Sequence, residues 1–159
     1  MTDPMDALTG LQTALKAESV SLNPCKLNPK LKVLLDHPNG TPRFTYAHVA
    51  NRTVQAVALF VLIEPYEGLP CFQIGYAVIE KLRGTGLGTR ILQQSIAELT
   101  NGLRNTPVKE FYLEALVSKE NISSNAIARK LISQSPIECI DEFSKQEAFQ
   151  YFRRVASDA

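Results

Sequence analysis

Apolar residues near the N-terminus recur at the three- and four-residue steps of an amphipathic helix. This spacing predicts a helix over about residues 5–18. The residues that carry it are Leu8, Leu11 and Leu15. A second short helix is predicted over residues 27–36, and the turn-forming residues of segment 37–42 predict a loop between the helices and a sheet.

Beyond residue 42 the pattern changes to the alternation that is typical of β-strands. Alternating side chains over residues 44–48 are followed by a turn at 51–53 and an almost continuously apolar run at 54–63. This pattern predicts a hairpin whose second strand is central in the sheet. A turn at 65–70 leads into another alternating strand at 72–78, so we expect a three-strand meander.

The second half of the chain alternates between helical and extended patterns. Apolar residues at helical steps predict a helix over residues 88–103 with one face on the sheet. A strand at 108–117, a helix at 121–133 and a closing hairpin, residues 137–143 with 148–155, are predicted after it. The predicted fold class is α/β (α+β), a mixed, mostly antiparallel central sheet flanked by helices.

Length and charge indicate a domain that works through a specific pocket. The 159 residues are the size of one ordinary domain, so we expect a single domain over residues 1–159. Seventeen basic and sixteen acidic side chains leave a net charge of +1, without the field that would attract nucleic acid or anionic lipid. We therefore expect neither nucleic acid nor a membrane as a partner.

Cysteine content and the N-terminal residues favour a cytoplasmic location. The three cysteines show no paired spacing, which predicts buried thiols rather than disulfides or a metal site. No apolar run is long enough to span a bilayer, and Asp3 and Asp6 stand where a secretory leader would carry basic residues.

The most informative stretch lies between a predicted strand and a predicted helix, and reads Arg83-Gly84-Thr85-Gly86-Leu87-Gly88-Thr89. Glycines let the backbone turn tightly and approach a ligand, and a helix N-terminus presents free N–H groups to phosphate. A P-loop would need lysine directly after its last glycine, where this chain has Thr89. A dinucleotide-binding turn would need another glycine spacing and a parallel crossover, so both alternatives are weak.

This turn resembles the pyrophosphate loop of the GNAT superfamily of acyltransferases, in which Arg or Gln is followed by two residues, Gly, one residue, and Gly or Ala. Arg83, Gly86 and Gly88 fill that pattern. The preceding segment 74–78 resembles the family strand that splays from its neighbour to admit pantetheine. Residues 117–130 resemble the family's second motif, and the match favours the RimJ/RimL-type branch.

The resemblance implies an N-acetyltransferase that moves the acetyl group of acetyl-CoA directly onto a primary amine of a small molecule, protein N-terminus or lysine. It implies a ternary complex, formed by a monomer or homodimer, in which a backbone N–H of the strand stabilises the oxyanion. The implied cofactor-binding residues are Ala77, Val78, Arg83, Gly84, Thr85, Gly86, Leu87, Gly88, Thr89, Asn121 and Ser124.

Two positions depart from the family pattern, and both concern proton transfer. Gln73 stands where a glutamate base often lies, and Ala128 stands where a tyrosine often protonates the leaving thiolate. Glu114 is our candidate for the base, the alternative being a solvated strand residue. Ser124, or its neighbour Ser123, is the candidate donor to the sulfur, the alternative being helix capping.

A catalytically inactive acyl-CoA-binding sensor or interaction module is the competing hypothesis for the function of this chain.

Overall fold

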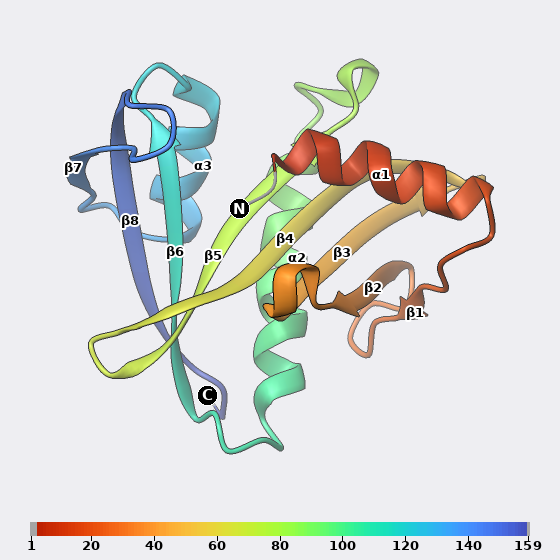
Figure 1. Ribbon diagram of the computed structural model, residues 1–159, viewed down its shortest axis with the longest axis horizontal. Coiled ribbons are helices and arrows are strands. Elements are labelled where there is room, and N and C mark those ends of the chain that lie inside the picture. Colours follow the sequence, from red (N-terminus) through yellow and green to blue (C-terminus); the bar gives the residue numbers. More distant parts are fainter. Residues whose placement is uncertain (1–2, 159) are drawn as a thin grey trace.

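The computed structural model describes residues 3–158, which form one eight-stranded sheet with helices on both faces (Figure 1). The strand order is β1-β2-β3-β4-β5-β6-β8-β7, and only β5 and β6 pair in parallel. The mixed, mostly antiparallel class predicted from the sequence is confirmed. The α-helices and strands are α1 (Pro4–Lys16), β1 (Asn23–Pro24), β2 (Leu31–Asp36), β3 (Arg43–Ala50), β4 (Thr53–Tyr66), β5 (Leu69–Val78), α2 (Leu87–Leu103), β6 (Glu110–Ser118), α3 (Ile122–Leu131), β7 (Ile137–Ile140) and β8 (Glu147–Ala156), and two short 3-10 helices cover Pro38–Gly40 and Glu80–Leu82.

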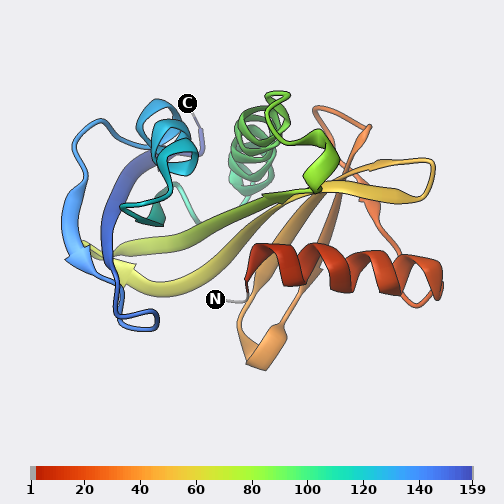
Figure 2. The ribbon, with the colours of Figure 1, turned by 90° about the horizontal axis from the view of Figure 1, so that it is seen from above.

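The sheet separates two hydrophobic cores. Figure 2 shows the sheet as a curved layer with α1 on one face and α2 and α3 on the other. The larger core lies between the sheet and α2 and α3, and includes the fully buried side chains of Phe60, Ile91 and Phe111. Burying each such side chain contributes roughly 1.5–3 kcal/mol relative to exposure. None of the helices formed by residues 3–158 is long and apolar enough to cross a membrane.

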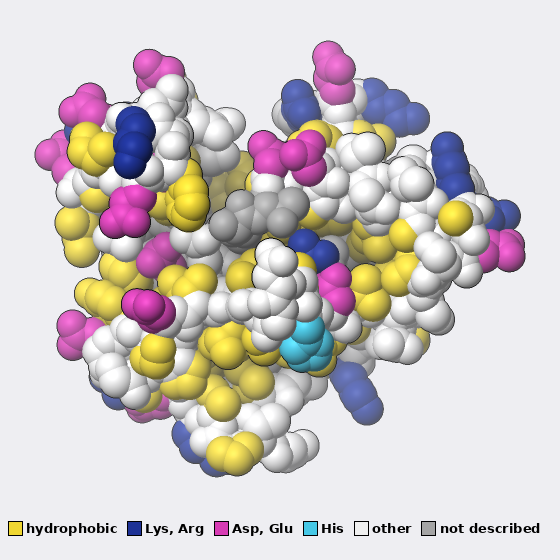
Figure 3. All heavy atoms as spheres, viewed as in Figure 1, with side chains coloured by type: hydrophobic (Ala, Val, Ile, Leu, Met, Phe, Trp, Pro, Cys, Tyr) yellow, Lys and Arg dark blue, Asp and Glu magenta, His cyan; other side chains and the backbone are white. Residues whose placement is uncertain are grey.

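The N-terminal helix α1 covers part of the other face. The Asp3 carboxylate accepts a hydrogen bond from the N–H of Met5 at 2.8 Å, and Pro4 occupies the first turn, so the helix starts at a defined cap. Its Leu8 and Leu11 are buried against β4 and β5. Figure 3 shows hydrophobic side chains still at the surface of this face below the helix.

The helix predicted over residues 27–36 is wrong, because its second half is strand β2, which pairs with β3 over its whole length. Pro29 lacks the N–H that a helix interior needs. The buried carboxylate of Glu98 on α2 accepts hydrogen bonds from the N–H groups of Leu27 (3.0 Å) and Asn28 (2.7 Å). The meander therefore extends from β1 to β5 instead of over the three predicted strands.

Two predicted boundaries also change. The turn expected over residues 65–70 is only Glu67 and Gly68, whose φ angles of 52° and 76° suit a two-residue hairpin between long strands. The helix predicted at 121–133 begins after its Asn121 cap, as expected, but ends at Leu131.

The three cysteines should differ in reactivity. Cys25 and Cys71 are buried as predicted, but Cys139 is partly exposed, which corrects the expectation for that residue. Burial, with Glu98 nearby, raises the pKa of Cys25 to about 11, and burial, with Glu114 nearby, raises the pKa of Cys71 to about 12. We expect a thiol reagent at about pH 8 to modify only Cys139 rapidly in the folded protein and all three thiols after denaturation. Mass spectrometry of the labelled protein measures this, and fast labelling of Cys71 would contradict it.

The same shifts predict an alkaline loss of stability. An unfolded thiol ionises near its ordinary pKa of 9.0, whereas the buried thiols keep their protons to a higher pH. The unfolded state therefore binds fewer protons than the native state above about pH 9, and the free energy of unfolding falls as the pH rises from there. Denaturant titrations of the protein and of its Cys71→Ala variant measure the difference, which should be smaller in the variant.

Candidate active site

The two parallel strands of the sheet pair over only part of their length. Their ladder ends at the pair Ile74 and Ala115, although β5 continues to Val78 and β6 to Ser118. Figure 1 shows the upper ends of β5 and β6 moving apart. A cavity of about 260 Å³, here called the inner cavity, lies between these ends and α3. Pro4 of α1 also lines it, so the cavity reaches from the α3 layer to the helix on the opposite face.

A second cavity of about 640 Å³, here called the outer cavity, lies at the N-terminus of α2. Its lining combines the glycine-rich turn with Asn121, Ser123 and Ser124 at the start of α3. The first turn of α2 contains no acidic residue, and no side chain caps it. Because the first N–H groups of an α-helix have no partner within the helix, those of α2 are donors for an anion. The inner and outer cavities share Tyr76, Asn121, Ser124 and Ile127.

The three glycines of the turn, Gly84, Gly86 and Gly88, have different structural roles. Gly84 and Gly86 have φ angles of +76° and +85°, and a Cβ on either would meet no atom within 4 Å. They are therefore needed for backbone conformation and leave open space above the turn. Gly88 differs, because a Cβ there would lie 2.9 Å from Cε2 of Tyr76. Gly88 lets α2 pack closely on β5.

The other side chains of the turn stabilise its shape. Arg83 is exposed, and its Nε donates a hydrogen bond to the carbonyl of Val78 at 3.2 Å. Thr85 Oγ1 donates to the carbonyl of Leu82 at 2.6 Å. Leu87 is buried in the larger core, while Thr89 lines the outer cavity. These contacts connect the end of β5 to the start of α2.

The hydrogen bonds between β4 and β5 distinguish the backbone N–H groups of Ala77 and Val78, the two candidates for stabilising the oxyanion. The N–H of Ile79 donates to the carbonyl of Gln55 beside β4 at 2.9 Å. Successive residues of a strand point their N–H groups to opposite edges, so the N–H of Ala77 also faces β4. The N–H of Val78 faces the other edge, where β6 has moved away. Ala77 lines the outer cavity, but its N–H is directed into the β4 ladder.

The start of α3 is held by a network of short polar contacts. Asn121 Oδ1 accepts from the N–H of Ser124 at 3.1 Å and from Ser123 Oγ at 3.3 Å. Asn125 Nδ2 donates to the carbonyl of Ser118 at 2.9 Å. Tyr151 OH donates to Asn125 Oδ1 at 2.6 Å. Asn121 and Ser123 therefore both serve the cap of α3.

Tyr76 is a residue of the site to which the sequence assigned no role. Its hydroxyl lies 2.8 Å from Ser124 Oγ, and this hydrogen bond joins β5 to α3 where the inner and outer cavities meet. Ala128, buried beside the inner cavity, has no hydroxyl. The alternation of segment 74–78 already places Tyr76 on the same face as Ile74 and Val78, but nothing local identifies Ser124 as its partner.

Glu114 is buried rather than solvated, with 7% of its surface exposed. One carboxylate oxygen accepts from Gln73 Nε2 at 2.7 Å, and the other accepts from Gln150 Nε2 at 3.2 Å. Gln73 pairs with Glu114 near the end of the β5–β6 ladder, next to the point where the strands separate. Glu114 lines neither the inner nor the outer cavity. Among the described residues its carboxylate has amide partners and no ion pair.

Cys71 lies on the same strand as Gln73 but is unsuited to covalent catalysis. Its side chain is fully buried, and burial together with the nearby carboxylate of Glu114 raises its pKa to about 12. The thiol therefore stays neutral near neutral pH and lacks the thiolate that attacks carbonyl carbon.

Solved structures of acetyltransferases are similar to this chain. The acetyltransferase of the GNAT family from Streptococcus pneumoniae matches with a TM-score of 0.52 at 12% identity, over 97% of this chain and 96% of its own. The chain has the fold of GNAT-family acetyltransferases. RimL, a ribosomal alpha-N-protein acetyltransferase in complex with coenzyme A, matches with a TM-score of 0.53 at 20% identity over 74% of this chain.

A spermidine N-acetyltransferase chimera from Vibrio cholerae and hSSAT is also similar to this chain, with a TM-score of 0.50 at 14% identity, over 74% of this chain and 68% of its own. This chain spans 64% of the RimL structure, less than two thirds of its length. By sequence, no protein-family model and no curated protein matches.

Substitutions in the turn should separate conformation from packing. Gly86→Ala places a side chain at φ +85°, so we expect coenzyme A binding to weaken about tenfold with stability lowered by roughly 1 kcal/mol. Gly88→Ala should lower stability by about 1–3 kcal/mol, because its Cβ collides with Tyr76. Isothermal titration with coenzyme A and denaturant unfolding measure the two effects.

Gly102→Ala is the matched control for both variants. A Cβ there meets nothing within 4 Å in the last turn of α2, so stability should stay the same or rise. Unchanged coenzyme A binding in Gly86→Ala would remove the turn from the candidate site.

Proposed function

We propose that this chain is an N-acetyltransferase that binds acetyl-CoA across the outer and inner cavities and transfers the acetyl group directly to a primary amine. The observation that carries the proposal is the gap between β5 and β6, which opens beside the uncapped N-terminus of α2. The N–H groups of that helix suit the pyrophosphate, and the smaller inner cavity suits the pantetheine arm. Coenzyme A in the RimL structure and the shared GNAT fold support this proposal.

The proposed reaction is a single displacement. The amine nitrogen attacks the thioester carbon, the C–N bond forms, and the C–S bond breaks to release the thiolate. The N–H of Val78 stabilises the negative charge that develops on the carbonyl oxygen. The proton lost by the amine passes to Glu114, directly or through water, and a hydroxyl of the Tyr76–Ser124 pair donates to the sulfur.

The hydroxyl pair provides the first test of this mechanism. Tyr76→Phe keeps the ring against Gly88 but removes the hydroxyl, so we expect kcat to fall about ten- to a hundredfold while coenzyme A still binds. Ser124→Ala in the same background should add little, because the two hydroxyls act as one unit. Steady-state kinetics with the four combinations measures the coupling.

Tyr112→Phe serves as the control for Tyr76→Phe. Tyr112 lies on β6 in an aromatic cluster with Tyr66 and Phe152, and lines neither cavity. A normal rate in Tyr76→Phe would exclude Tyr76 as the donor to the sulfur.

The candidate base is tested by Glu114→Gln. This change keeps the shape of a buried side chain but removes its proton-accepting charge, so we expect kcat to fall by about two to four orders of magnitude with coenzyme A binding intact. Raising the pH should restore part of the rate, because an amine with a pKa near 10.4 then arrives deprotonated without help. Kinetics over a pH series measures both effects.

Glu110→Gln on the same strand is the control for the base. Glu110 pairs with Arg154 at a partly exposed position, and its replacement should leave the rate unchanged. A near-normal rate in Glu114→Gln would remove Glu114 from the mechanism.

A second candidate function is an acyl-CoA-binding sensor without turnover. It is favoured by the network around Glu114, in which both carboxylate oxygens are already held by the amides of Gln73 and Gln150. Release of free thiol from acetyl-CoA, assayed over peptides with free N-termini, lysine peptides and polyamines, distinguishes the two. Saturable, amine-dependent release excludes the sensor, whereas coenzyme A binding without release across the panel favours it.

A further inference from the structure

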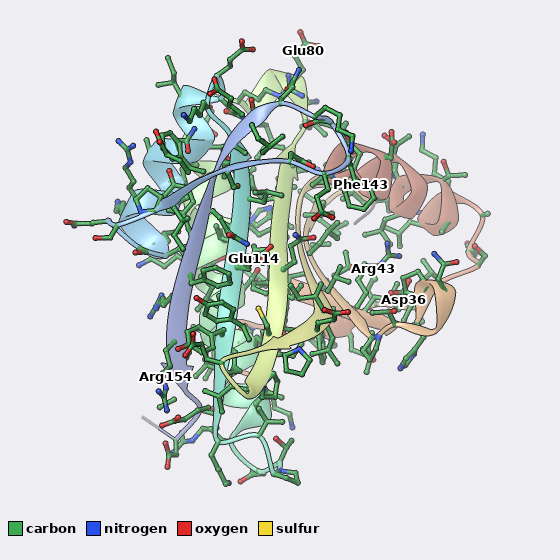
Figure 4. All side chains as sticks on the ribbon, turned by 60° about the vertical axis from the view of Figure 1, so that its left-hand side comes forward. Asp36, Arg43, Glu80, Glu114, Phe143 and Arg154 are labelled. Atoms are coloured by element: carbon green, nitrogen blue, oxygen red, sulfur yellow. The ribbon has the colours of Figure 1, made fainter. Side chains whose placement is uncertain are left out.

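A groove of about 840 Å³ lies between the C-terminal halves of α2 and α3 and the end of β8. A hollow of about 320 Å³ continues it past Arg104 to Lys26. We call the two together the basic groove. Figure 4 shows Glu80, beside the glycine-rich turn, at the top of the view and Arg154, which lines the basic groove, in its lower part. Among the described residues, none that lines the basic groove also lines the outer cavity, and Ile132 is shared with the inner cavity.

The lining of the basic groove is strongly cationic in a chain that is nearly neutral. Its charged residues are Lys26, Arg104, Lys130, Arg153 and Arg154. No aspartate or glutamate is among the described residues that line it, although the whole chain has sixteen acidic residues against seventeen basic ones. The excess of positive charge is therefore local.

Most of these cations have no acidic partner among the residues that the structure describes. Arg154 pairs with Glu110. Within residues 3–158, no carboxylate lies within ion-pairing distance of Arg104, Lys130 or Arg153. One guanidinium nitrogen of Arg153 donates to the carbonyl of Leu131 at 2.9 Å, which holds that side chain over the groove.

Helix polarity explains only part of the cluster. Arg104 and Lys130 lie at the C-terminal ends of α2 and α3, where a positive charge is stabilised by the helix dipole. Arg153 belongs to a strand and Lys26 to a loop, so the dipole does not account for them. The four residues converge on one groove from four different segments.

The shape and lining of the groove favour an acidic polypeptide over a nucleic acid. Its floor contains apolar side chains, namely Ile96, Leu131 and Val155. No aromatic ring is among the described lining residues, so the groove offers no surface for stacking bases. Arginine forks match carboxylates in bidentate geometry, and an apolar floor accepts the aliphatic side chains of a peptide.

We infer that the basic groove is a docking site for an acidic, partly apolar peptide segment of a partner protein, independent of acetyl-CoA. The carboxylates of that segment pair with Arg104, Lys130 and Arg153, while its aliphatic side chains contact the floor. The groove shares no lining residue with the outer cavity and only Ile132 with the inner cavity, so we expect both ligands to bind at the same time.

The test uses a fluorescein-labelled peptide of glutamate and leucine with a blocked N-terminus and no lysine, so that it has no amine to enter the proposed acetyl-transfer site. Fluorescence anisotropy should show saturable binding that weakens with salt and is lost when glutamine replaces glutamate in the peptide. The double variant Arg104→Glu with Arg153→Glu should bind about tenfold more weakly or worse.

The double variant Lys16→Glu with Lys145→Glu is the matched control. It changes the net charge equally at exposed positions outside the groove and should keep wild-type affinity. The double variant Arg104→Gln with Arg153→Gln removes the two positive charges without adding negative ones. Titration of all variants with coenzyme A tests the proposed function separately from peptide binding. Absent peptide binding, equal loss in the control variant, or tighter binding of a single-stranded oligonucleotide would overturn the inference.

Discussion

The early end of the β5–β6 ladder is the constraint on which the rest of the site depends. Parting two strands inside a sheet leaves backbone N–H and C=O groups without their ladder partners, which costs free energy unless other groups bond them. The structure supplies some of these partners. Arg83 bonds the carbonyl of Val78 at the end of β5, and Asn125 bonds the carbonyl of Ser118 at the end of β6. Tyr151 fixes Asn125 in turn, so the end of β6 is tied to α3 and β8 instead of β5.

The glycine-rich turn shows how the same residues serve fold and site together. A tight connection from β5 into α2 requires positive φ at Gly84 and Gly86, and these angles bring the first N–H groups of the helix to the mouth of the gap. Gly88 then lets the helix approach until its backbone lies against Tyr76. The sequence pattern predicted a ligand site at the turn but not this division of roles, because local spacing does not show which residues pack against a strand.

The elements with strong periodicity could be predicted, since their patterns reflect burial on one face. The segment at 27–36 could not, because its conformation depends on Glu98, located 71 and 70 positions away from the N–H groups that it bonds. The same limit applies within the candidate site. Tyr76 and Ser124 are 48 positions apart, and Glu114 meets Gln73 and Gln150 across 41 and 36 positions. Such contacts arise only once the strand order is set, so the sequence named the residues without showing which of them meet.

The position of Pro4 has a consequence for how two reactants could meet. The inner cavity is lined by α3 on one side of the sheet and by the first turn of α1 on the other. The sheet therefore separates two sides of the molecule, and the gap between β5 and β6, here called the slit, connects them. A long cofactor that lies along α2 and α3 approaches the slit from one side. An acceptor that approaches from the α1 side uses a separate entrance, where hydrophobic side chains remain at the surface. Under the proposed function, neither reactant would then block the other, and the two products could leave on opposite sides of the sheet in either order.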